Sequence, residues 1–416
     1  MRIMIVGGGI GGCALALSLQ DAGFDDVHVH ESAREVREVG VGINLLPHAV
    51  RELTELGLLD ELEGRAVRTG ALAYHNRFGQ RIWSEPRGIA AGYHWPQLSI
   101  HRGELLGVLH RQTVARLGHE RFTSGHHLAG IEHAGDVVVA RFAGGDEPVE
   151  ADVLVACDGV HSTVRALLVP NEGPPLWNGV TMWRGVTESE PFLDGRTMVM
   201  AGVVAQRMVV YPIRDLPDGR QLVNWVAERR TDDGRPMPRQ EWDAMATPAE
   251  PLAHFGDFRF DWLDVPALIK GCEQVLQYPM VDREPLPRWR LGRVTLLGDA
   301  AHPMYPVGSN GASQAILDAR VLAHELATRP DVGTALDAYE ALRRPATAAV
   351  VLANRQAGPE RCMEIVAERA PDGFADLDAV ISPEELAEIS ASYKRTAGFD
   401  PASLNTRRSL SVHAAM

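Results

Sequence analysis

The chain opens with Met1-Arg-Ile-Met-Ile-Val-Gly7-Gly8-Gly9-Ile10-Gly11-Gly12, an apolar run that ends in glycines and continues into an alanine-rich segment. This order predicts a strand, a tight turn and a helix that together hold the pyrophosphate of a dinucleotide. Gly7 is expected to make the turn, Gly9 to admit the phosphates, and Gly12 to let helix and strand pack closely. Unpaired N–H groups at the helix start favour the phosphate charge. A purely structural glycine turn is the alternative.

Three more apolar runs support this interpretation. The segment Val27-His-Val-His-Glu31 ends in an acid 19 residues after Gly12, close to the roughly 20 expected for a carboxylate that binds a ribose hydroxyl. Runs at 152–156 and 293–297 lead into Asp158 and Asp299. Unbroken apolar runs are typical of parallel strands covered on both faces, and ligands lie beyond the carboxyl ends of such strands. We therefore expect one site assembled from distant segments.

Composition narrows the class of protein. With 416 residues the chain is too long for one ordinary core, so two or three structural units are expected. The formal charge of −14 disfavours nucleic acid and anionic membrane surfaces as partners. The four cysteines lack metal-ligand spacing and are interpreted as reduced thiols of a cytoplasmic protein: Cys13, Cys157, Cys272 and Cys362. The apolar start has neither the basic region of a signal peptide nor the length of a membrane span.

The middle of the chain has a different pattern. Segments at 180–186, 197–203, 207–213 and 221–227 are rich in β-formers, which predicts an antiparallel sheet inserted into the dinucleotide-binding domain. Short helices are expected around Trp242 and Trp262. An ordinary β subdomain without a ligand is the alternative to a substrate domain at this junction.

Other elements are predicted from the glycine, proline and serine residues at which they begin or end. Residues 40–44 are interpreted as a glycine-bearing loop, followed by a helix that begins at Pro47. Long helices are expected at about 311–327 and 332–356, with Pro345 kinking the second or ending its first half. A further helix is expected after Ser382, and residues 407–416 are expected to be disordered.

Three motifs together resemble the single-component FAD-dependent aromatic hydroxylases of the para-hydroxybenzoate hydroxylase type, the group A flavoprotein monooxygenases. They are the first glycine turn with Glu31, Asp158-Gly-Val-His-Ser-Thr-Val-Arg165, and Gly298-Asp-Ala-Ala-His-Pro303, and the resemblance covers about residues 1–356. Segments such as 40–44, 83–88, 99–105, 181–187, 277–283 and 304–318 are similar to phenazine hydroxylases that act on 5-methylphenazine-1-carboxylate. The resemblance is weakest after about Arg355 and in parts of the inserted sheet, which leaves the substrate open.

The resemblance implies an α/β fold with a Rossmann-like FAD-binding domain, an inserted antiparallel β-sheet substrate domain and C-terminal helices. The expected boundaries are 1–75, 99–176 and 277–330 for the discontinuous FAD-binding domain, 76–98 and 177–276 for the substrate domain, and 331–416 for the C-terminal helical region and tail.

The cofactor roles follow from the resemblance and from the chemistry of the residues. Asp299 is expected to accept hydrogen bonds from ribityl hydroxyls, and Arg102 to add a cation near the phosphates; a cap at Asp299 and a surface ion pair at Arg102 are the alternatives. Asp158 is associated with FAD and the nicotinamide cofactor, or simply makes a turn. Gly308 and Gly311 are expected to let bare backbone approach the flavin ring. The complete FAD set is Gly7, Gly9, Ile10, Gly11, Gly12, Glu31, Ser32, Gly42, Ile43, Arg102, Asp158, Asp299, Pro306, Gly308, Gly311 and Ala312.

Substrate residues are expected on the inserted sheet. Met182, Trp183, Arg184 and Tyr211 are the candidates: an aromatic ring to stack on a planar substrate, and Arg184 to meet a carboxylate or phenolate. Sheet core and surface roles are the alternatives. His302 is interpreted as structural, with proton transfer as the alternative.

The reaction that the resemblance implies is hydroxylation of a planar aromatic compound through a C4a-hydroperoxyflavin, with or without loss of a carboxyl group. FAD performs the chemistry, so no side chain is assigned as catalytic and no metal is expected. NADH or NADPH is the transient reductant, O2 the co-substrate, and the protein a monomer or homodimer. The alternatives are a flavoprotein oxidase or dehydrogenase, a nicotinamide dehydrogenase without flavin, and a flavin-bound regulatory module.

Overall fold

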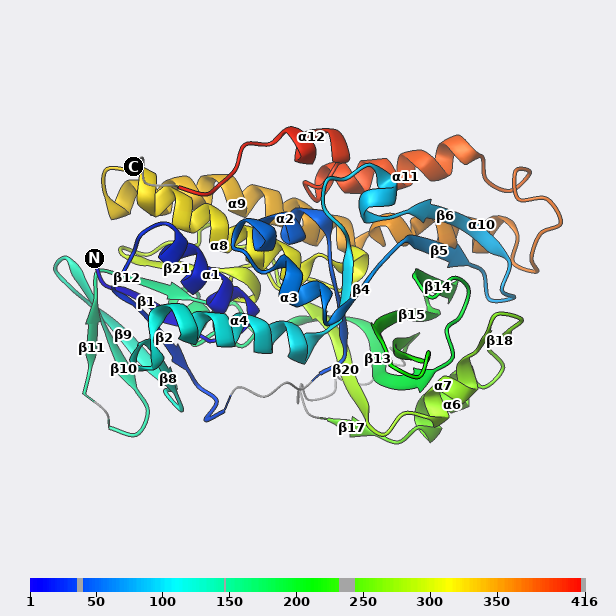
Figure 1. Cartoon of the computed structure of the whole chain (residues 1–416), viewed down its shortest axis with the longest axis horizontal. Coiled ribbons are helices and arrows are strands. Elements are labelled where there is room, and N and C mark those ends of the chain that lie inside the picture. The colour runs from blue at the N-terminus through cyan, green and yellow to red at the C-terminus, as the bar shows by residue number, and fades with distance from the viewer. Residues whose placement is uncertain (36–39, 146, 232–243, 413–416) are drawn as a thin grey trace.

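The computed structural model describes residues 1–35, 40–145, 147–231 and 244–412 (Figure 1). A five-stranded parallel sheet forms its first structural unit. Every neighbouring pair in the order β21-β12-β1-β2-β8 is parallel. The strands are β1 (Ile3–Val6), β2 (Val27–Glu31), β8 (Phe122–Ser124), β12 (Val153–Ala156) and β21 (Val294–Leu296). The four apolar runs therefore lie in one sheet, as the sequence predicted.

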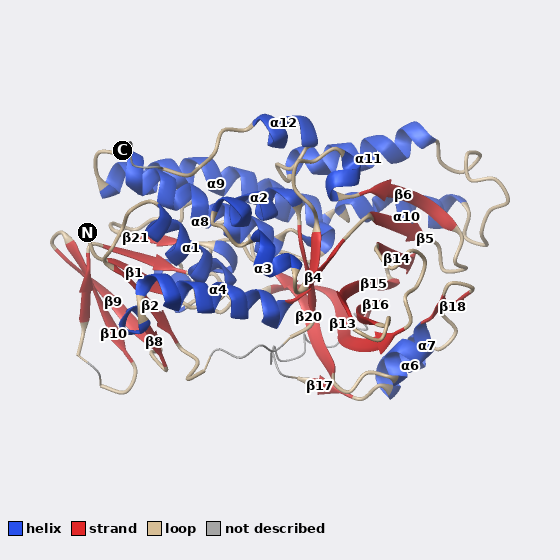
Figure 2. Cartoon of the chain, viewed as in Figure 1, coloured by secondary structure: helices blue, strands red, loops and turns tan. Residues whose placement is uncertain are grey.

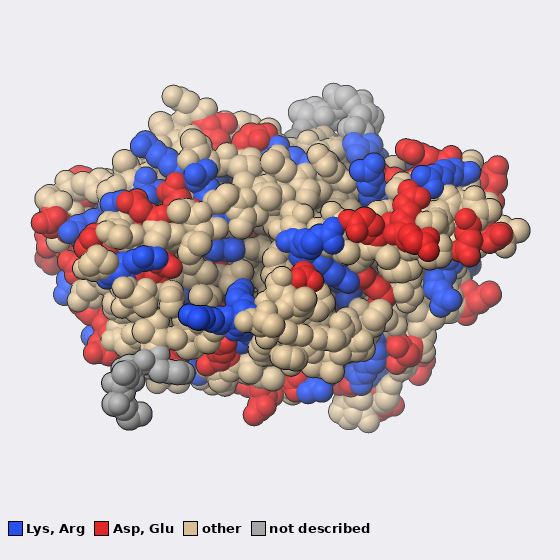
Figure 3. Space-filling view, turned by 90° about the horizontal axis from the view of Figure 1, so that it is seen from above, with Lys and Arg blue, Asp and Glu red and all other residues tan. Residues whose placement is uncertain are grey.

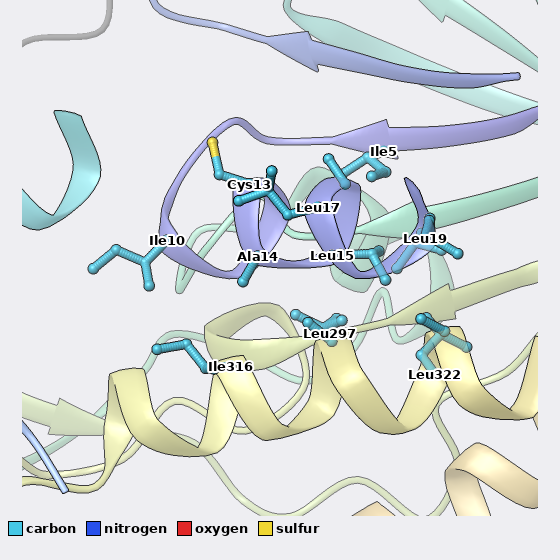
Figure 4. Packing of buried hydrophobic residues seen from close by; sticks show 14 of the residues in the cluster. Ile5, Ile10, Cys13, Ala14, Leu15, Leu17, Leu19, Leu297, Ile316 and Leu322 are labelled. Atoms are coloured by element: carbon cyan, nitrogen blue, oxygen red, sulfur yellow. The ribbon is translucent and has the colours of Figure 1, made fainter. Parts of the chain in front are cut away.

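Helices cover this sheet because its strands are apolar on both faces. The main ones are α1 (Ile10–Asp21), α4 (Arg102–Leu117), α8 (Gly311–Thr328) and α9 (Val332–Arg355). Helix α1 is buried along most of its length and packs against α8. Figure 4 shows Leu15 and Leu19 of α1 on the side that faces Leu322 of α8.

An eight-stranded sheet forms the second unit, on the opposite side of the molecule (Figure 2). Its order is β17-β20-β13-β16-β15-β14-β5-β6, and all neighbours are antiparallel except the parallel pair β14–β5. The strands are β5 (Ala71–His75), β6 (Arg81–Pro86), β13 (Leu176–Ser189), β14 (Thr197–Val203), β15 (Gln206–Asp215), β16 (Gln221–Arg230), β17 (Met245–Ala246) and β20 (Val275–Asp282). Strand β5 falls within the range 1–75 and most of β20 within the range 277–330, both expected for the FAD-binding domain, although both strands pair in this sheet.

Smaller elements complete the chain. Two three-stranded sheets consist of β3 (Gly42–Leu45), β7 (Leu98–His101) and β4 (Ala66–Arg68), and of β11 (Val149–Ala151), β10 (Val137–Phe142) and β9 (Leu128–Ala134); β18 (Arg259–Phe260) pairs with β19 (Leu263–Asp264). The remaining helices are α2 (Pro47–Glu55), α3 (Leu59–Glu63), α5 (Thr163–Leu168), α6 (Ala249–Phe255), α7 (Val265–Lys270), α10 (Arg361–Arg369), α11 (Pro383–Thr396) and α12 (Pro401–Thr406). Single turns of 3-10 helix, η1 to η5, lie at 88–91, 119–121, 298–300, 307–309 and 358–360.

Several local predictions were wrong. The expected loop at 40–44 contains strand β3, because Gly42 to Leu45 pair with β7. Trp262 lies in the turn between β18 and β19, and the helices are α6 and α7 on either side; the helix expected around Trp242 lies outside the described residues. Helix α9 was expected at about 332–356 and is confirmed at Val332–Arg355; it continues through Pro345, so an end of its first half there was wrong.

The C-terminal tail is packed as far as the structure describes it. Arg407 pairs with Glu52, and Arg320 donates to Ser411 Oγ (2.6 Å). The expected disorder is therefore wrong for residues 407–412, and residues 413–416 lie outside the described part.

Acidic and basic side chains are interspersed on the face shown in Figure 3, with wide neutral areas between them. All four cysteines are free. Within the described ranges, no helix combines the length and the apolar composition needed to cross a membrane.

Candidate functional site

The glycine turn before α1 contains glycines of two kinds. A Cβ on Gly7 would lie 2.4 Å from the Cys157 carbonyl oxygen, and a Cβ on Gly12 would lie 1.9 Å from the Gly7 carbonyl oxygen. A Cβ on Gly9 would meet no atom within 4 Å. Gly9 is also the N-cap of α1 and has no side-chain capping bond. Gly7 and Gly12 therefore serve packing, while Gly9 leaves an uncapped helix start open to an anion.

Glu31 lies at the carboxyl end of β2, beside this turn. Its Oε2 accepts a hydrogen bond from Gly8 N–H (2.6 Å), and its Oε1 accepts from Ala33 N–H (2.7 Å) and from the Ser32 hydroxyl (3.2 Å). Because a carboxylate offers about four acceptor positions, these bonds fix its orientation and still allow a sugar hydroxyl to donate.

Arg102 and Asp299 both line the central part of the site, where their opposite charges interact. Burial lowers the pKa of the Arg102 guanidinium, and the Asp299 carboxylate opposes that shift. Asp299 is exposed where it faces the central cavity, while the surrounding protein desolvates its carboxyl group and raises its pKa. A carboxylate presented to a cavity in this way is suited to accept hydrogen bonds from ligand hydroxyls.

Asp158 serves the local fold with one of its two oxygens. Oδ2 accepts hydrogen bonds from Thr163 N–H (2.8 Å) and Val164 N–H (3.4 Å) at the start of α5. Oδ1 is buried and has no hydrogen-bond partner among the described residues. Asp158 also lines an open groove with Glu31, Arg102 and Asp299. The turn-making role is therefore present, and one acceptor remains for a ligand.

A central cavity of about 350 Å³ joins these segments to the eight-stranded sheet. Thirteen of the predicted site residues line it: Gly9, Ile10, Gly11, Gly42, Ile43, Arg102, Met182, Arg184, Tyr211, Asp299, Pro306, Gly311 and Ala312. Glu31 and Asp158 line the adjoining groove. The structure places Gly7, Gly12, Ser32, Trp183 and Gly308 elsewhere.

Strand alternation decides which sheet residues reach the cavity. Met182 and Arg184 of β13 line it, whereas Trp183 between them packs on the opposite face, with its ring 5.8 Å from that of His254. The prediction that Trp183 contacts substrate was therefore wrong. Met198 and Met200 of β14 add apolar walls that were not predicted.

Gly42 is held by the sheet on both sides of its peptide. Its N–H donates to Asn224 Oδ1 (2.6 Å), and its carbonyl accepts from Arg184 Nη2 (3.1 Å). A Cβ there would lie 2.8 Å from the Tyr211 ring. The missing side chain of Gly42 thus leaves room for Asn224 and Tyr211 of the sheet as well as for a ligand.

Tyr211 is buried, and burial raises the pKa of its hydroxyl to about 12. Tyr211 keeps its proton at neutral pH.

A buried ion cluster closes the cavity further along β15. Arg207 Nε donates to Glu228 Oε2 (2.7 Å), and Arg207 Nη1 also donates to Glu360. Burial disfavours the Arg207 charge, but Glu228 and Glu360 outweigh it and raise the pKa of the guanidinium. Burial raises the pKa of Glu360 to about 7.

His302 belongs to a structural ion network. Its Nε2 lies 2.6 Å from Asp318 Oδ2, while Arg343 Nε donates to Asp318 Oδ1 (2.6 Å) and Gly298 N–H donates to Oδ2 (3.2 Å). Burial opposes ionisation of Asp318, but His302 and Arg343 prevail and lower its pKa. The buried imidazole packs on Trp289, with ring centroids 5.5 Å apart. This arrangement supports the structural interpretation of His302.

Gly308 differs from its predicted role. It has φ +64°, and a Cβ on it would lie 2.3 Å from the Tyr393 hydroxyl oxygen. The missing side chain therefore accommodates Tyr393 of α11, and Gly308 faces away from the central cavity. Its neighbours Pro306, Ser309, Asn310 and Gly311 line the cavity.

Besides Met198 and Met200, sequence reasoning missed a group of polar residues in and around the site. Arg207, Asn224 and Glu228 occupy alternate positions in strands that were predicted, so the strand period was a signal for them. Glu360 and Tyr393 come from the C-terminal region, where no pattern indicated a contact with the cavity or its turn.

The site fits FAD on three observations: the open helix start at Gly9, the acceptor Asp299 presented to the cavity, and the backbone turn before α8. The model of the family described as FAD binding domain matches residues 1–354. Phenazine 1,6-dicarboxylic acid hydroxylase of Lysobacter antibioticus is 45% identical over 401 residues, which cover 94% of this chain and 96% of that protein.

Two further similarities extend the comparison. A 3-amino-4-hydroxybenzoate 2-monooxygenase of Streptomyces platensis is 34% identical, covering 86% of this chain and 88% of its own. The fold is similar to that of a salicylate hydroxylase in complex with substrate, with a TM-score of 0.75, 23% identity, and coverage of 100% of this chain and 99% of the other.

Proposed function

This chain belongs to the family of FAD binding domains, and we propose that it hydroxylates a planar aromatic compound, using FAD, NADH or NADPH, and O2. One observation carries the proposal: a single cavity joins the open glycine turn to a methionine-lined slot on the eight-stranded sheet. Clefts between structural units are where cofactor and substrate most often meet.

The chain's residues hold FAD along its whole length in this proposal. Glu31 and Ser32 hold the adenosine ribose, and the amides that follow Gly9 meet the pyrophosphate. Because the chain is acidic, with a formal charge of −14, positive charge near the phosphates must come from a local side chain, and Arg102 provides it. Asp299 accepts hydrogen bonds from the ribityl hydroxyls.

Two backbone segments would hold the flavin ring. Gly42 and Ile43 of β3 would approach it on one side, and the N–H groups of Gly311 and Ala312, at the start of α8 after the turn from Pro306, would meet its pyrimidine edge. Bound FAD supplies the redox chemistry, taking a hydride from the nicotinamide and activating O2 for insertion. The chain contributes position, polarity and exclusion of water.

The substrate slot is apolar and adaptable. Met182, Met198, Met200 and Val209 form its walls, and thioether side chains adapt to flat rings of different outline. Tyr211, protonated at neutral pH, donates a hydrogen bond to the substrate from the flavin end of the slot. We infer a phenazine-like or other secondary-metabolite aromatic substrate, by analogy with the Lysobacter relative, with or without loss of a carboxyl group.

Arg184 is the proposed partner of a substrate carboxylate or phenolate. Its Nη2 is bonded to the Gly42 carbonyl, and its buried Nε has no hydrogen-bond partner among the described residues. An unpaired buried donor beside the cavity favours an anionic oxygen there.

We further propose that the protein is a monomer or homodimer and that it is cytoplasmic, a location consistent with four free thiols.

The test is a panel of aromatic compounds, including phenazine carboxylates and hydroxybenzoates, added to FAD-loaded protein with NADH or NADPH. We expect planar aromatics to accelerate nicotinamide oxidation. Met200→Trp should fill the slot and raise KM for the aromatic, whereas Trp183→Phe, altered on the other face of the sheet, should leave KM unchanged. Protein that takes up no FAD, or whose nicotinamide oxidation no aromatic accelerates, contradicts the proposal.

A further inference from the structure

The turn that precedes α8 is in contact with a helix from the far end of the chain. The Tyr393 hydroxyl of α11 lies 2.7 Å from Asn354 Oδ1 and 3.1 Å from the Val307 carbonyl oxygen, and donates its proton to one of them. It accepts a hydrogen bond from Asn310 Nδ2 (3.0 Å). Its ring fills the space beside Gly308. One side chain therefore contacts three residues of the turn, Val307, Gly308 and Asn310.

The backbone of this turn has an uncommon conformation. Gly308 has φ +64°, and the next residue, Ser309, has φ +58° although it is not a glycine. Left-handed backbone at a non-glycine residue persists where surrounding contacts hold it. Asn44 Nδ2 donates to the Ser309 hydroxyl (3.5 Å) on the cavity side, and Tyr393 packs from behind.

Helix α11 is itself anchored on both sides of Tyr393. Ser390 Oγ (2.5 Å) and Lys394 Nζ (2.8 Å) both donate to the buried Glu85 Oε2 of β6. Gln314 Nε2 of α8 donates to the carbonyl of Ala397, just past the end of α11 (3.0 Å). Because hydrogen bonds fix α11 to the sheet and to α8, Tyr393 is held in place and restrains the backbone of the turn that it contacts.

Pro306, Ser309, Asn310 and Gly311 line the central cavity on the opposite side of the same turn. We propose that Tyr393 is a positioning residue: it sets the backbone of the turn so that the N–H groups of Gly311 and Ala312, which follow the turn at the start of α8, meet the pyrimidine edge of FAD. The inference rests on the proposed function. It makes α11, which lies beyond residues 1–354 of the family domain, a part of the cofactor site.

The test compares two tyrosine hydroxyls that hold the same C-terminal segment. Tyr393→Phe keeps the ring beside Gly308 and removes the hydroxyl from the turn. Tyr93→Phe removes a buried hydroxyl that donates to the Phe399 carbonyl (2.7 Å) and does not contact the turn. The readouts are the FAD dissociation constant of the apoprotein, the flavin midpoint potential and the visible flavin spectrum.

For Tyr393→Phe we expect a dissociation constant raised roughly five- to tenfold, a more negative midpoint potential and a shifted spectrum, because the donors are less well placed for reduced flavin. The KM of the aromatic substrate should stay unchanged. Tyr93→Phe should match wild type in every readout. If Tyr393→Phe does not fold, Ser390→Ala, which releases one anchor of α11 at Glu85 and does not alter the lining of the central cavity, should change the same readouts in the same direction by a smaller factor.

Two results would overturn the inference. One is wild-type affinity, potential and spectrum in Tyr393→Phe; the other is an equal change in Tyr93→Phe, which would reduce the effect to general docking of the C-terminal segment. Wild-type protein that binds no FAD would contradict the proposed function itself, so the two failures are distinguishable.

Discussion

Gly9 and Gly12 lie three residues apart, and side chains placed on them meet opposite surroundings. Alanine at Gly9 enters open space in an extended backbone conformation, so we expect it to cost no more than about 1 kcal/mol of stability. It should weaken FAD binding at least roughly tenfold, because the methyl group takes the place of the pyrophosphate. Alanine at Gly12 meets the Gly7 carbonyl and should cost about 1–3 kcal/mol.

Urea unfolding of the apoproteins and FAD titration separate these two effects. Wild-type FAD affinity in Gly9→Ala would show that the open space at the helix start does not hold the phosphates.

Glu360 makes stability depend on pH. Its pKa is raised from 4.5 to about 7, so the folded protein keeps a proton that the unfolded chain loses above pH 4.5. The stability due to this proton is complete below pH 4.5 and is lost as the pH rises to 7. Relative to Glu360→Gln, the free energy of unfolding of wild type should fall by about 3 kcal/mol over that range. Parallel curves for the two proteins in urea melts between pH 4 and 8 would be the opposite result.

Residues whose role depends on neighbours in sequence were predictable, and residues whose role depends on distant partners were not. The glycine turn and Asp299 follow directly from strand ends, so their position could be read from the chain. Gly308 was correctly identified as a position that requires glycine, but glycine is required because Tyr393, 85 residues later, packs against it. The contact between Glu360 and Arg207 joins distant parts of the chain, so no local sequence pattern indicates it.

Two acids, one on α8 and one on α11, differ in their surroundings. Asp318 of α8 is buried against Arg343, so Asp318→Asn leaves the buried guanidinium without its counter-charge and should cost about 3–5 kcal/mol. Glu388 of α11 pairs with Arg395 where both side chains are exposed, and Glu388→Gln should cost less than about 1 kcal/mol. Chemical denaturation of both variants tests this; similar losses would mean that the Asp318 network is not what holds the turn after β21.

Elements were predicted well where one physical preference dominates. The parallel strands are unbroken apolar runs, and helix α11 begins at Pro383, directly after Ser382, whose side chain accepts from Glu385 N–H as a cap. Helix α9 was predicted over nearly its full length, and only an end at Pro345, one of the two expectations for that residue, was wrong. Buried residues on both sides of it, including Tyr339 and Val350, pack in the core and outweigh the roughly 3 kcal/mol that an interior proline costs. Strand β3 was missed because its four residues begin with a glycine.

The whole molecule assembles one cavity from segments that span 350 residues of chain. The glycine turn before α1, the eight-stranded sheet and the turn before α8 all line this cavity, and α11 contacts the turn before α8. Figure 1 shows how these elements are arranged in the chain. Such a cavity can place an aromatic ring against a bound flavin and keep bulk water away. In this arrangement we expect oxygen from O2 to enter that ring.

The most direct test is turnover under ¹⁸O2 with FAD-loaded protein, a nicotinamide reductant and the aromatic compound that best accelerates its oxidation. Mass spectrometry should find one ¹⁸O atom in the hydroxylated product, with product formed in proportion to the nicotinamide consumed. Hydrogen peroxide in stoichiometric yield without an oxygenated product, or a product whose oxygen comes from water, would contradict the account.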